Sequence, residues 1–199
     1  DFGDYDISTN NELMAYSIDT LSRRIYQIHI KNLKTGELYP ETLEQTTGSV
    51  TWANDNKTLF YVKQDLKTLR SFQIYAHQLG TNQKEDVLVY EETDETFYCS
   101  VYKSKSENYV IINSSSTLSD EYRIINANEP QNTPNLFQKR ERGLEYSIYH
   151  HNNGFYIVTN QDHKNFSIKF CNEYKTDQKN WKTIIEGRDS TLIEGIDVF

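Results

Sequence analysis

Short apolar runs return along this chain at a regular spacing, and each of them is preceded by a polar turn. The runs start at Leu13, Leu59, Tyr109 and Phe155, so the steps are 46 residues (13 to 59), 50 residues (59 to 109) and 46 residues (109 to 155). The turns before them read STNNE, ANDNK, SKSEN and HHNNG. Because Asn, Asp, Ser and Gly stabilise tight turns, the pattern predicts a repeated turn-and-strand unit.

Further strands are predicted around each run, always in the same order. A first strand opens each unit, as DYDIS, SVTWA, YCSVYK and EYSIYHH. A third strand follows the run, over residues 24–30, 72–79, 121–127 and 165–171. A weaker fourth strand reads VLVYEE, NLFQK and WKTIIE in the second, third and fourth units.

Four-stranded units with a period of about 45–50 residues are typical of β-propeller blades. We therefore predict an all-β fold of about four four-stranded antiparallel blades, over residues 1–48, 49–95, 96–142 and 143–189, with residues 190–199 as the first strand of a next blade. An antiparallel sandwich also uses short strands and regular turns, but it has no reason to repeat four times in this order. No stretch shows the periodicity of a long helix.

The aromatic content agrees with stacked blades. The chain contains fifteen Tyr and nine Phe, and a blade must bury both of its faces against neighbours. An incomplete ring leaves its first and last faces bare. We therefore expect the chain either to associate through these faces or to close as a small four-bladed ring.

The charge and the apolar runs argue against a nucleic-acid-binding protein and against a membrane-spanning one, and the cysteines indicate the compartment. The net charge is −8 and the sequence pI is ≈ 5.1, without the basic patch of a nucleic-acid-binding protein. No apolar run approaches the length of a membrane span, and no signal peptide is visible. The two cysteines, Cys99 and Cys171, are typical of a reducing compartment such as the cytoplasm, although a single disulfide stays open.

Six segments carry a resemblance to a known family. Taken in order, LMAYSIDTLSRRIYQIHIKNLKTGE, WANDNKTLFYV, IYAHQLGT, LVYEETDETFY, KNFSI and LIEG resemble the N-terminal propeller of oligopeptidase B, also called protease II. This is a branch of the prolyl oligopeptidase family of serine peptidases (peptidase S9). The match runs from about Asp4 to Phe199.

The resemblance implies a seven-bladed propeller that caps an α/β-hydrolase domain, with the active site in the cavity between them. Family members cleave oligopeptides after Lys or Arg, and their Ser, Asp and His all belong to the hydrolase domain. This chain would then be an internal fragment of the propeller, about four blades of seven. It would have no catalytic residues and no metal or cofactor site, and it would be inactive alone. Its partners would be the hydrolase domain and basic oligopeptides.

The residues agree with the absence of a nucleophile. A hydrolase nucleophile elbow reads Gly-x-Ser-x-Gly on a strand-to-helix turn. The nearest segment, TGSVT around Ser49, lacks both glycines in register. No alternation of strands and helices is present to support such a turn.

Four residues near the end of the chain resemble a metal-ligand set: His150, His151, His163 and Asp162. The first two are adjacent, so on a strand they point to opposite faces. We therefore interpret all four as polar residues of blade edges and turns.

The segment from Glu85 to Glu95 is rich in acidic residues. It contains Glu85, Asp86, Glu91, Glu92, Asp94 and Glu95. Such a group attracts cationic peptides through its long-range field, but we interpret it first as a solvated connection between the second and third blades.

A second charged segment, DTLSRR, lies in the turn after the second strand of the first blade. Its Arg23 and Arg24 are suited to bidentate pairing with carboxylates of an adjoining domain; the alternative is an ordinary charged turn. Trp52 and Trp181 are expected in the packing between blades, each with a partner for its indole N–H. Cys99 and Cys171 are expected in strands as small apolar residues. NSSSTLSDE is read as a turn of the third blade.

Two other function classes stay open. An interaction scaffold built from a propeller is the first, although the Gly-His and Trp-Asp signatures of WD40 repeats are missing. A propeller hydrolase acting on sugars is the second, and it requires paired carboxylates near the central channel.

Overall fold

Fifteen strands and two short 3₁₀ helices form the regular structure of residues 1–199 in the computed structural model. Only the turns and the last residues of the chain lie outside them. The structure has no helix with the length and apolar character that a membrane crossing requires. The elements are β1 (Phe2–Ile7), β2 (Leu13–Ile18), β3 (Tyr26–Asn32), β4 (Leu38–Trp52), β5 (Thr58–Gln64), β6 (Ser71–Gln78), η1 (Gln83–Glu85), β7 (Val87–Glu91), β8 (Tyr98–Lys103), β9 (Tyr109–Ser115), β10 (Asp120–Asn126), β11 (Asn135–Gln138), β12 (Tyr146–His151), β13 (Gly154–Thr159), β14 (Ser167–Asn172), η2 (Gln178–Asn180) and β15 (Lys182–Ile185).

The strands pair only with their neighbours in sequence, and all pairs are antiparallel. Strands β8 to β11 form one four-stranded sheet and β12 to β15 form another. The first seven strands form a single sheet because β4 is shared. Its first half pairs with β3 and its second half pairs with β5. The seven-stranded sheet therefore consists of two four-stranded units joined through β4.

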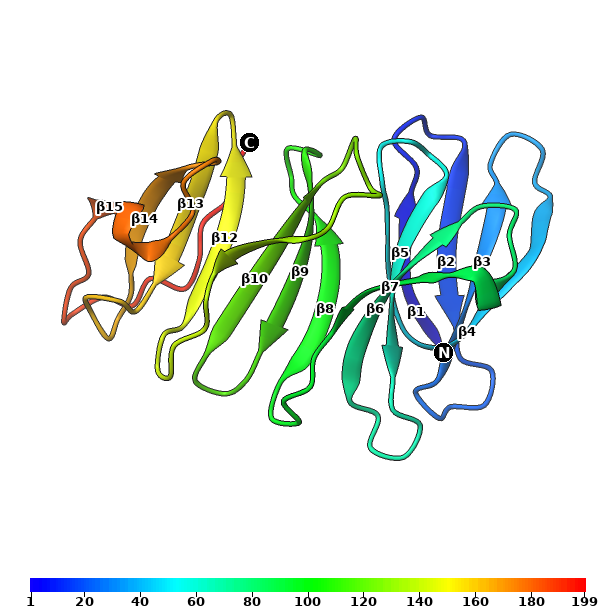
Figure 1. Ribbon diagram of the computed structural model, residues 1–199, viewed down its shortest axis with the longest axis horizontal. Helices are drawn as coiled ribbons and strands as arrows, with labels where there is room; N and C mark the ends of the chain where they lie inside the picture. Colours follow the sequence, from blue (N-terminus) through cyan, green and yellow to red (C-terminus); the bar gives the residue numbers. More distant parts are fainter.

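We refer to these units as blades 1 to 4. Blade 1 is β1 to β3 with the first half of β4, blade 2 is the second half of β4 with β5 to β7, and blades 3 and 4 are the two remaining sheets. Figure 1 shows them standing side by side in one row, from blue to orange. This arrangement differs from the two facing sheets of a sandwich, and it confirms the prediction of antiparallel four-stranded units.

The row is open. Blades 1 and 4 lie at opposite ends of the long axis (Figure 1), so the expectation of a closed four-bladed ring is wrong for this structure. Closure would require the two end blades to meet, and they lie apart.

Three hydrophobic clusters lie between successive blades. The cluster between blades 1 and 2 is centred on Trp52 and Tyr61, and the next one contains Phe60 and Ile112. The cluster between blades 3 and 4 is aromatic: the rings of Phe137 and Phe155 are 4.9 Å apart in edge-to-face geometry. Alternate residues of one strand therefore enter different clusters, as the two-residue period of a strand requires. The prediction that aromatic residues pack between blades is confirmed.

The polar turns found in the sequence connect the first and second strands of each blade. Each turn places one residue in the left-handed region at the same position, with φ between 54° and 60°; these residues are Asn11, Asn56, Glu107 and Asn152. Successive turns also contact each other. The Asn10 N–H donates to Asn56 Oδ1 at 2.9 Å, and Asn54 Nδ2 donates to the Glu107 carbonyl at 2.9 Å.

Two segments differ from the sequence pattern. The fourth strand of blade 1, in the first half of β4, is not visible in the pattern because its residues are mostly polar and include Pro40. At the other end, residues 190–199 form no strand: Thr191 makes an isolated bridge with Arg188, and the Ile193 N–H donates to the Asn165 carbonyl at 3.0 Å. A first strand of a next blade therefore stays a prediction. The division into blades stays an interpretation too, and its first boundary lies inside β4.

Candidate functional site

Two arginines and two glutamates form a buried charged cluster between blades 2 and 3. Glu92 directly follows β7, Glu121 and Arg123 belong to the start of β10, and Arg140 follows β11. We call these four residues the Arg140 cluster. They come from three segments that meet at one end of the blades, where the chain passes from one blade to the next.

The arginines bridge the glutamates. Arg140 forms ion pairs with Glu92 and, at 3.2 Å, with Glu121. Arg123 pairs with Glu121 at 2.6 Å. Each guanidinium also lies over an aromatic ring, with Arg140 3.9 Å from the centre of Phe97 and Arg123 4.2 Å from that of Tyr90. The two carboxylates are only 4% and 6% exposed, so the arginines are their main source of compensation.

The ionisation of the cluster follows from this geometry. Burial alone would raise the pKa of Glu92, but hydrogen bonds from Arg140 and Ser114 outweigh it and lower that pKa to about 2. The pKa of Glu121 is likewise lowered by Arg140, against the effect of burial. Both glutamates are therefore ionised at neutral pH and neutralised by the two arginines. The Arg140 cluster therefore joins blade 3 to the end of blade 2. Both of its carboxylates are paired with arginines, so neither is free to bind a ligand.

The connection from Glu92 to Phe97 is held by a third arginine. Arg70 donates to the carbonyl oxygens of Glu92, Asp94 and Phe97 at 3.0–3.2 Å. The guanidinium supplies several donors in fixed directions, which suits the capture of a curved backbone segment. The passage from blade 2 to blade 3 is therefore preformed.

Several acidic residues of the segment from Glu85 to Glu95 accept hydrogen bonds from other residues of the chain. Asp86 is buried and accepts from the Tyr61 hydroxyl at 2.8 Å and pairs with His77 Nδ1 at 2.7 Å. Glu85 accepts the Asn82 N–H in a capping box. The interpretation as a solvated connection is therefore wrong for Asp86 and Glu92, because both side chains are buried.

The remaining acidic residues of this segment face solvent. Asp94 accepts the Thr96 N–H at 3.0 Å, and Glu91 and Glu95 are exposed without a hydrogen bond or ion pair. Glu85 is also exposed, so a field that attracts cations would rest on four of the six acidic residues.

The structure disperses the four residues that resembled a metal-ligand set. His150 is buried and the adjacent His151 is half-exposed, on opposite faces of β12. His163 pairs with Asp189 at 3.4 Å, and Asp162 pairs with Lys169. They remain polar residues of strands and turns, as interpreted from the sequence.

His150 lies in a hydrogen-bonded line that the sequence did not indicate. Its Nδ1 is 2.7 Å from the Ser106 hydroxyl, and its Nε2 is 3.2 Å from Glu173 Oε2. Burial lowers the pKa of His150, against the opposing effect of Glu173. Hydroxyl, imidazole and carboxylate in line also occur in hydrolases. Here, however, the imidazole is fully buried and packed against Tyr109, so we interpret the line as a structural contact between blades 3 and 4.

The turn that carries Arg23 and Arg24 is stabilised from within. The Asp19 carboxylate accepts the N–H groups of Leu21 at 3.0 Å and Arg24 at 2.6 Å. Both arginine side chains are exposed, and neither forms an ion pair within the chain. The turn therefore presents two unpaired cations on a fixed backbone.

The remaining sequence predictions concern packing. Trp52 and Trp181 are buried, and their indole N–H groups donate to the carbonyls of Asp6 at 3.3 Å and Thr176 at 2.7 Å. Both predictions are confirmed. Cys99 and Cys171 are buried free thiols in β8 and β14, so the disulfide left open by the sequence is not formed.

Comparison with known proteins adds to this picture. The family model described as "Prolyl oligopeptidase, N-terminal beta-propeller domain" matches residues 1–199. Dipeptidyl aminopeptidase BI of Pseudoxanthomonas mexicana is 40% identical over 201 residues, covering 99% of this chain and 27% of the relative. Protease 2 of Moraxella lacunata is 30% identical over 167 residues, covering 83% of this chain and 24% of the relative.

Solved structures with the same arrangement include two oligopeptidases B. The Trypanosoma brucei protein, in a closed form with covalently bound antipain, superposes with a TM-score of 0.89 at 25% identity, covering 100% of this chain and 28% of that one. The Leishmania major protein gives a TM-score of 0.87 at 25% identity, covering 94% and 26%. The chain thus spans about a quarter of the length of these relatives.

Proposed function

Because this chain belongs to the prolyl oligopeptidase family, as part of its N-terminal β-propeller domain, we propose that it is the non-catalytic wall of a serine peptidase that admits only short, flexible peptides. The membership confirms the resemblance found in the sequence and the propeller fold. The role in substrate access, the substrate class and the hydrolase partner are proposals.

One observation carries the proposal: the whole chain matches the model of the propeller domain. The contacts between blades agree with it. The Arg140 cluster and the His150 line join successive blades, as a rigid wall requires. The first strands of blades 3 and 4, β8 and β12, lie at a sheet edge, where they would face a central channel in a completed ring.

We propose that Arg23 and Arg24 contact the hydrolase domain of the same polypeptide. They are exposed, unpaired and held on a preformed turn, and arginine pairs well with carboxylates at an interface. Exchange of either residue for Glu in the full-length protein should change peptide turnover without unfolding the propeller. Unchanged turnover in both variants would remove this part of the proposal.

The proposed substrates are short peptides cleaved after Lys or Arg, by Ser-His-Asp acyl transfer in the hydrolase domain. The 40% identity to a protein named dipeptidyl aminopeptidase favours a second candidate, in which dipeptides are removed from free N-termini. In both candidates the propeller restricts access to the active site, and both reactions are compatible with a cytoplasmic peptidase. A scaffold that only binds proteins is the runner-up.

A pair of substrates separates these candidates. The protein expressed from its complete gene is assayed with an Arg-Arg coumarylamide that has a free N-terminus and with the same compound blocked by an N-terminal acyl group. Endopeptidase action should cleave the blocked compound, whereas dipeptide removal should require the free amine. Absence of turnover with both compounds would favour the scaffold. The 199-residue chain alone should cleave neither, and its measurable turnover would overturn the proposal.

A further inference from the structure

The outermost strand of each blade has one edge without a partner strand. These strands are the first half of β4, β7, β11 and β15. An open edge presents unpaired backbone N–H and C=O groups, which attract further strands unless they are covered. The way each edge is covered therefore indicates whether it is available for binding.

Blades 1 and 3 have their edges covered by the next blade. In blade 1, the Gln83 side chain donates to the Glu44 carbonyl at 3.1 Å and accepts the Glu44 N–H at 3.1 Å, as a paired strand would. In blade 3, the Thr176 hydroxyl donates to the Phe137 carbonyl at 2.7 Å. Both covering residues come from the connection between the third and fourth strands of the following blade.

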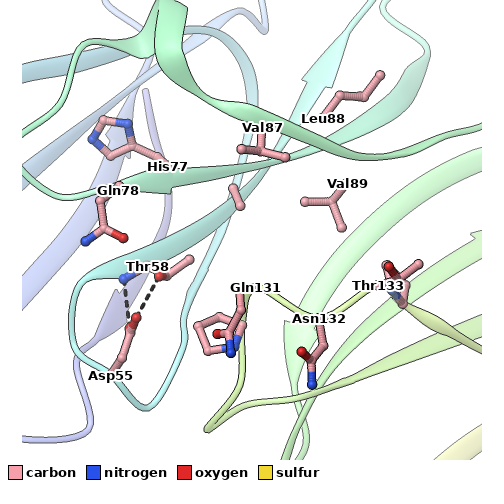
Figure 2. Close-up of a pocket in the computed structure, with 13 residues that line it drawn as sticks. Asp55, Thr58, His77, Gln78, Val87, Leu88, Val89, Gln131, Asn132 and Thr133 are labelled. Atoms are coloured by element: carbon pink, nitrogen blue, oxygen red, sulfur yellow. Dashed lines mark hydrogen bonds between the residues drawn. The ribbon is translucent and has the colours of Figure 1, made fainter.

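The edge of blade 2 is different. The corresponding connection of blade 3, residues 127–134, makes no hydrogen bond to β7. Its hydrogen bonds lie within the connection, as in the Asn132 N–H to the Glu129 carbonyl at 3.0 Å, or go to residues outside β7, as in the Asn54 N–H to the Ala127 carbonyl at 2.8 Å. Between this connection and β7 lies a cavity of ≈ 470 Å³. Figure 2 shows Val87 and Val89 on one side of it and Gln131, Asn132 and Thr133 on the other.

The cavity runs along β7, the outermost strand of blade 2. Val87, Leu88 and Val89 all line it, although consecutive side chains of a strand point to opposite faces. Ala76, His77 and Gln78 of the neighbouring strand β6 line it too, so the cavity covers this corner of the sheet of blade 2 and extends along β7, whose outer edge has no partner strand. The facing segment is bounded by Pro130 and Pro134, which lack N–H donors.

We propose that the β7 edge receives an extended segment of another polypeptide as an additional strand. Backbone hydrogen bonds to β7 would supply affinity, and one apolar side chain would enter the cavity beside Val87, which is 64% exposed. Strand addition with a pocket for alternate side chains is an established mode of peptide recognition. Residues 130–134 stand on the other side of the cavity, so a single extended segment is a better occupant than the whole sheet edge of a second copy.

The charges around the edge define the segment further. Asp55 lines the cavity, and Glu91 lies exposed at the other end of β7. The chain as a whole carries a net charge of −8. The expected segment therefore has alternating apolar residues flanked by basic ones. This inference is independent of the proposed peptidase activity.

The test uses the protein expressed from its complete gene and a fluorescent peptide, Orn-Thr-Val-Thr-Val-Thr-Orn, whose ornithines supply positive charge. We expect saturable binding by fluorescence anisotropy and slower hydrogen exchange in a peptide fragment that contains residues 87–91. An analogue with N-methylated valines keeps the side chains but not the donors, and it should not bind.

Variants at two edges complete the test. Val87→Lys should weaken binding by about tenfold or more, because an edge lysine opposes strand addition. Leu136→Lys, at an exposed position of the covered strand β11, should leave binding unchanged. Unchanged exchange over residues 87–91 at millimolar peptide would overturn the proposal, as would equal effects of the two variants. Slow hydrogen exchange over residues 87–91 in the absence of peptide, in a monomer or a dimer, would also overturn the proposal, because the edge would then already be covered.

Discussion

At the scale of single residues, side chains of the same type differ in burial and in ion pairing, and the residue type alone does not show which are buried. Glu91 and Glu92 are neighbours in sequence, yet the first is exposed and the second is 3% exposed and bound by Arg140. A buried ion pair adds little net stability compared with apolar packing, but removal of one partner is severe. The Arg140 cluster is therefore sensitive to single substitutions.

Arg140→Met should destabilise the protein by about 3–5 kcal/mol at pH 7, because Glu92 loses its partner and Glu121 keeps only Arg123. In the native protein the pKa of Glu92 is about 2, below its ordinary value of 4.5, so its stabilising effect is present above pH 4.5 and is lost as the pH falls toward 2. In the variant, the effect of burial is opposed only by the remaining hydrogen bonds, such as that from Ser114, so this pKa rises. The deficit should therefore shrink as the pH falls from 7 to 4.

Urea unfolding of the two proteins between pH 4 and pH 8 measures this difference. Arg142→Met is the matched control, since Arg142 is exposed and unpaired, and it should change the unfolding free energy by less than about 0.5 kcal/mol. A deficit that is equal at all pH values would contradict the assigned role of the glutamates.

At the scale of elements, the blades repeat in backbone geometry more closely than in sequence. The turn between the first and second strands contains Asn at the left-handed position in blades 1, 2 and 4, and Glu107 in blade 3. Asn tolerates this conformation better than other residues with a Cβ atom. The turns of blades 1 to 3 span five residues and that of blade 4 only two, yet all four place a residue with positive φ two positions before the second strand, and in blade 3 that residue is an unfavourable Glu.

Glu107→Asn should therefore stabilise the protein by about 0.5–1 kcal/mol, and Asn152→Glu should destabilise it by a similar amount. Asn152 is the suitable reverse case because its side chain makes no hydrogen bond, whereas Asn56 accepts one from Asn10. Thermal unfolding of both variants checks the prediction. Shifts of the same sign in the two proteins would argue against a backbone origin.

At the scale of the whole molecule, the open row leaves the outer faces of blades 1 and 4 without neighbours. Ile185 in β15, which pairs with Ile168 on the outer face of blade 4, is 47% exposed, and Phe2 in β1 is 58% exposed. Apolar surface of this kind favours association. The row of four blades also explains the three separate cores, because each core needs two adjacent blades.

The 199-residue chain, produced alone, should therefore self-associate in a concentration-dependent way, as measured by light scattering coupled to gel filtration. Ile185→Lys should reduce association by placing a charge on the outer face of blade 4, whereas Lys182→Arg, on the same strand, should not. A monomer at all concentrations would show that the end faces do not drive association.

Prediction from sequence was successful for the fold and limited for the polar clusters. The period of 46–50 residues predicted the blades, because strand alternation and turn residues are local signals. The fourth strand of blade 1 was missed because its half-polar residues and Pro40 resemble a loop. The Arg140 cluster was missed because Glu92 and Arg140 are 48 residues apart, and no local signal links them.

The sequence by itself determined the all-β architecture, the order of strands within a blade and the packing roles of Trp52 and Trp181, since each depends on neighbours along the chain. Only the tertiary structure decided which acidic residues are buried, that His150 lies between Ser106 and Glu173, and that the β7 edge is uncovered. These features depend on distances between blades. Such distances arise from the stacking and twist of whole sheets, which no local pattern of residues encodes.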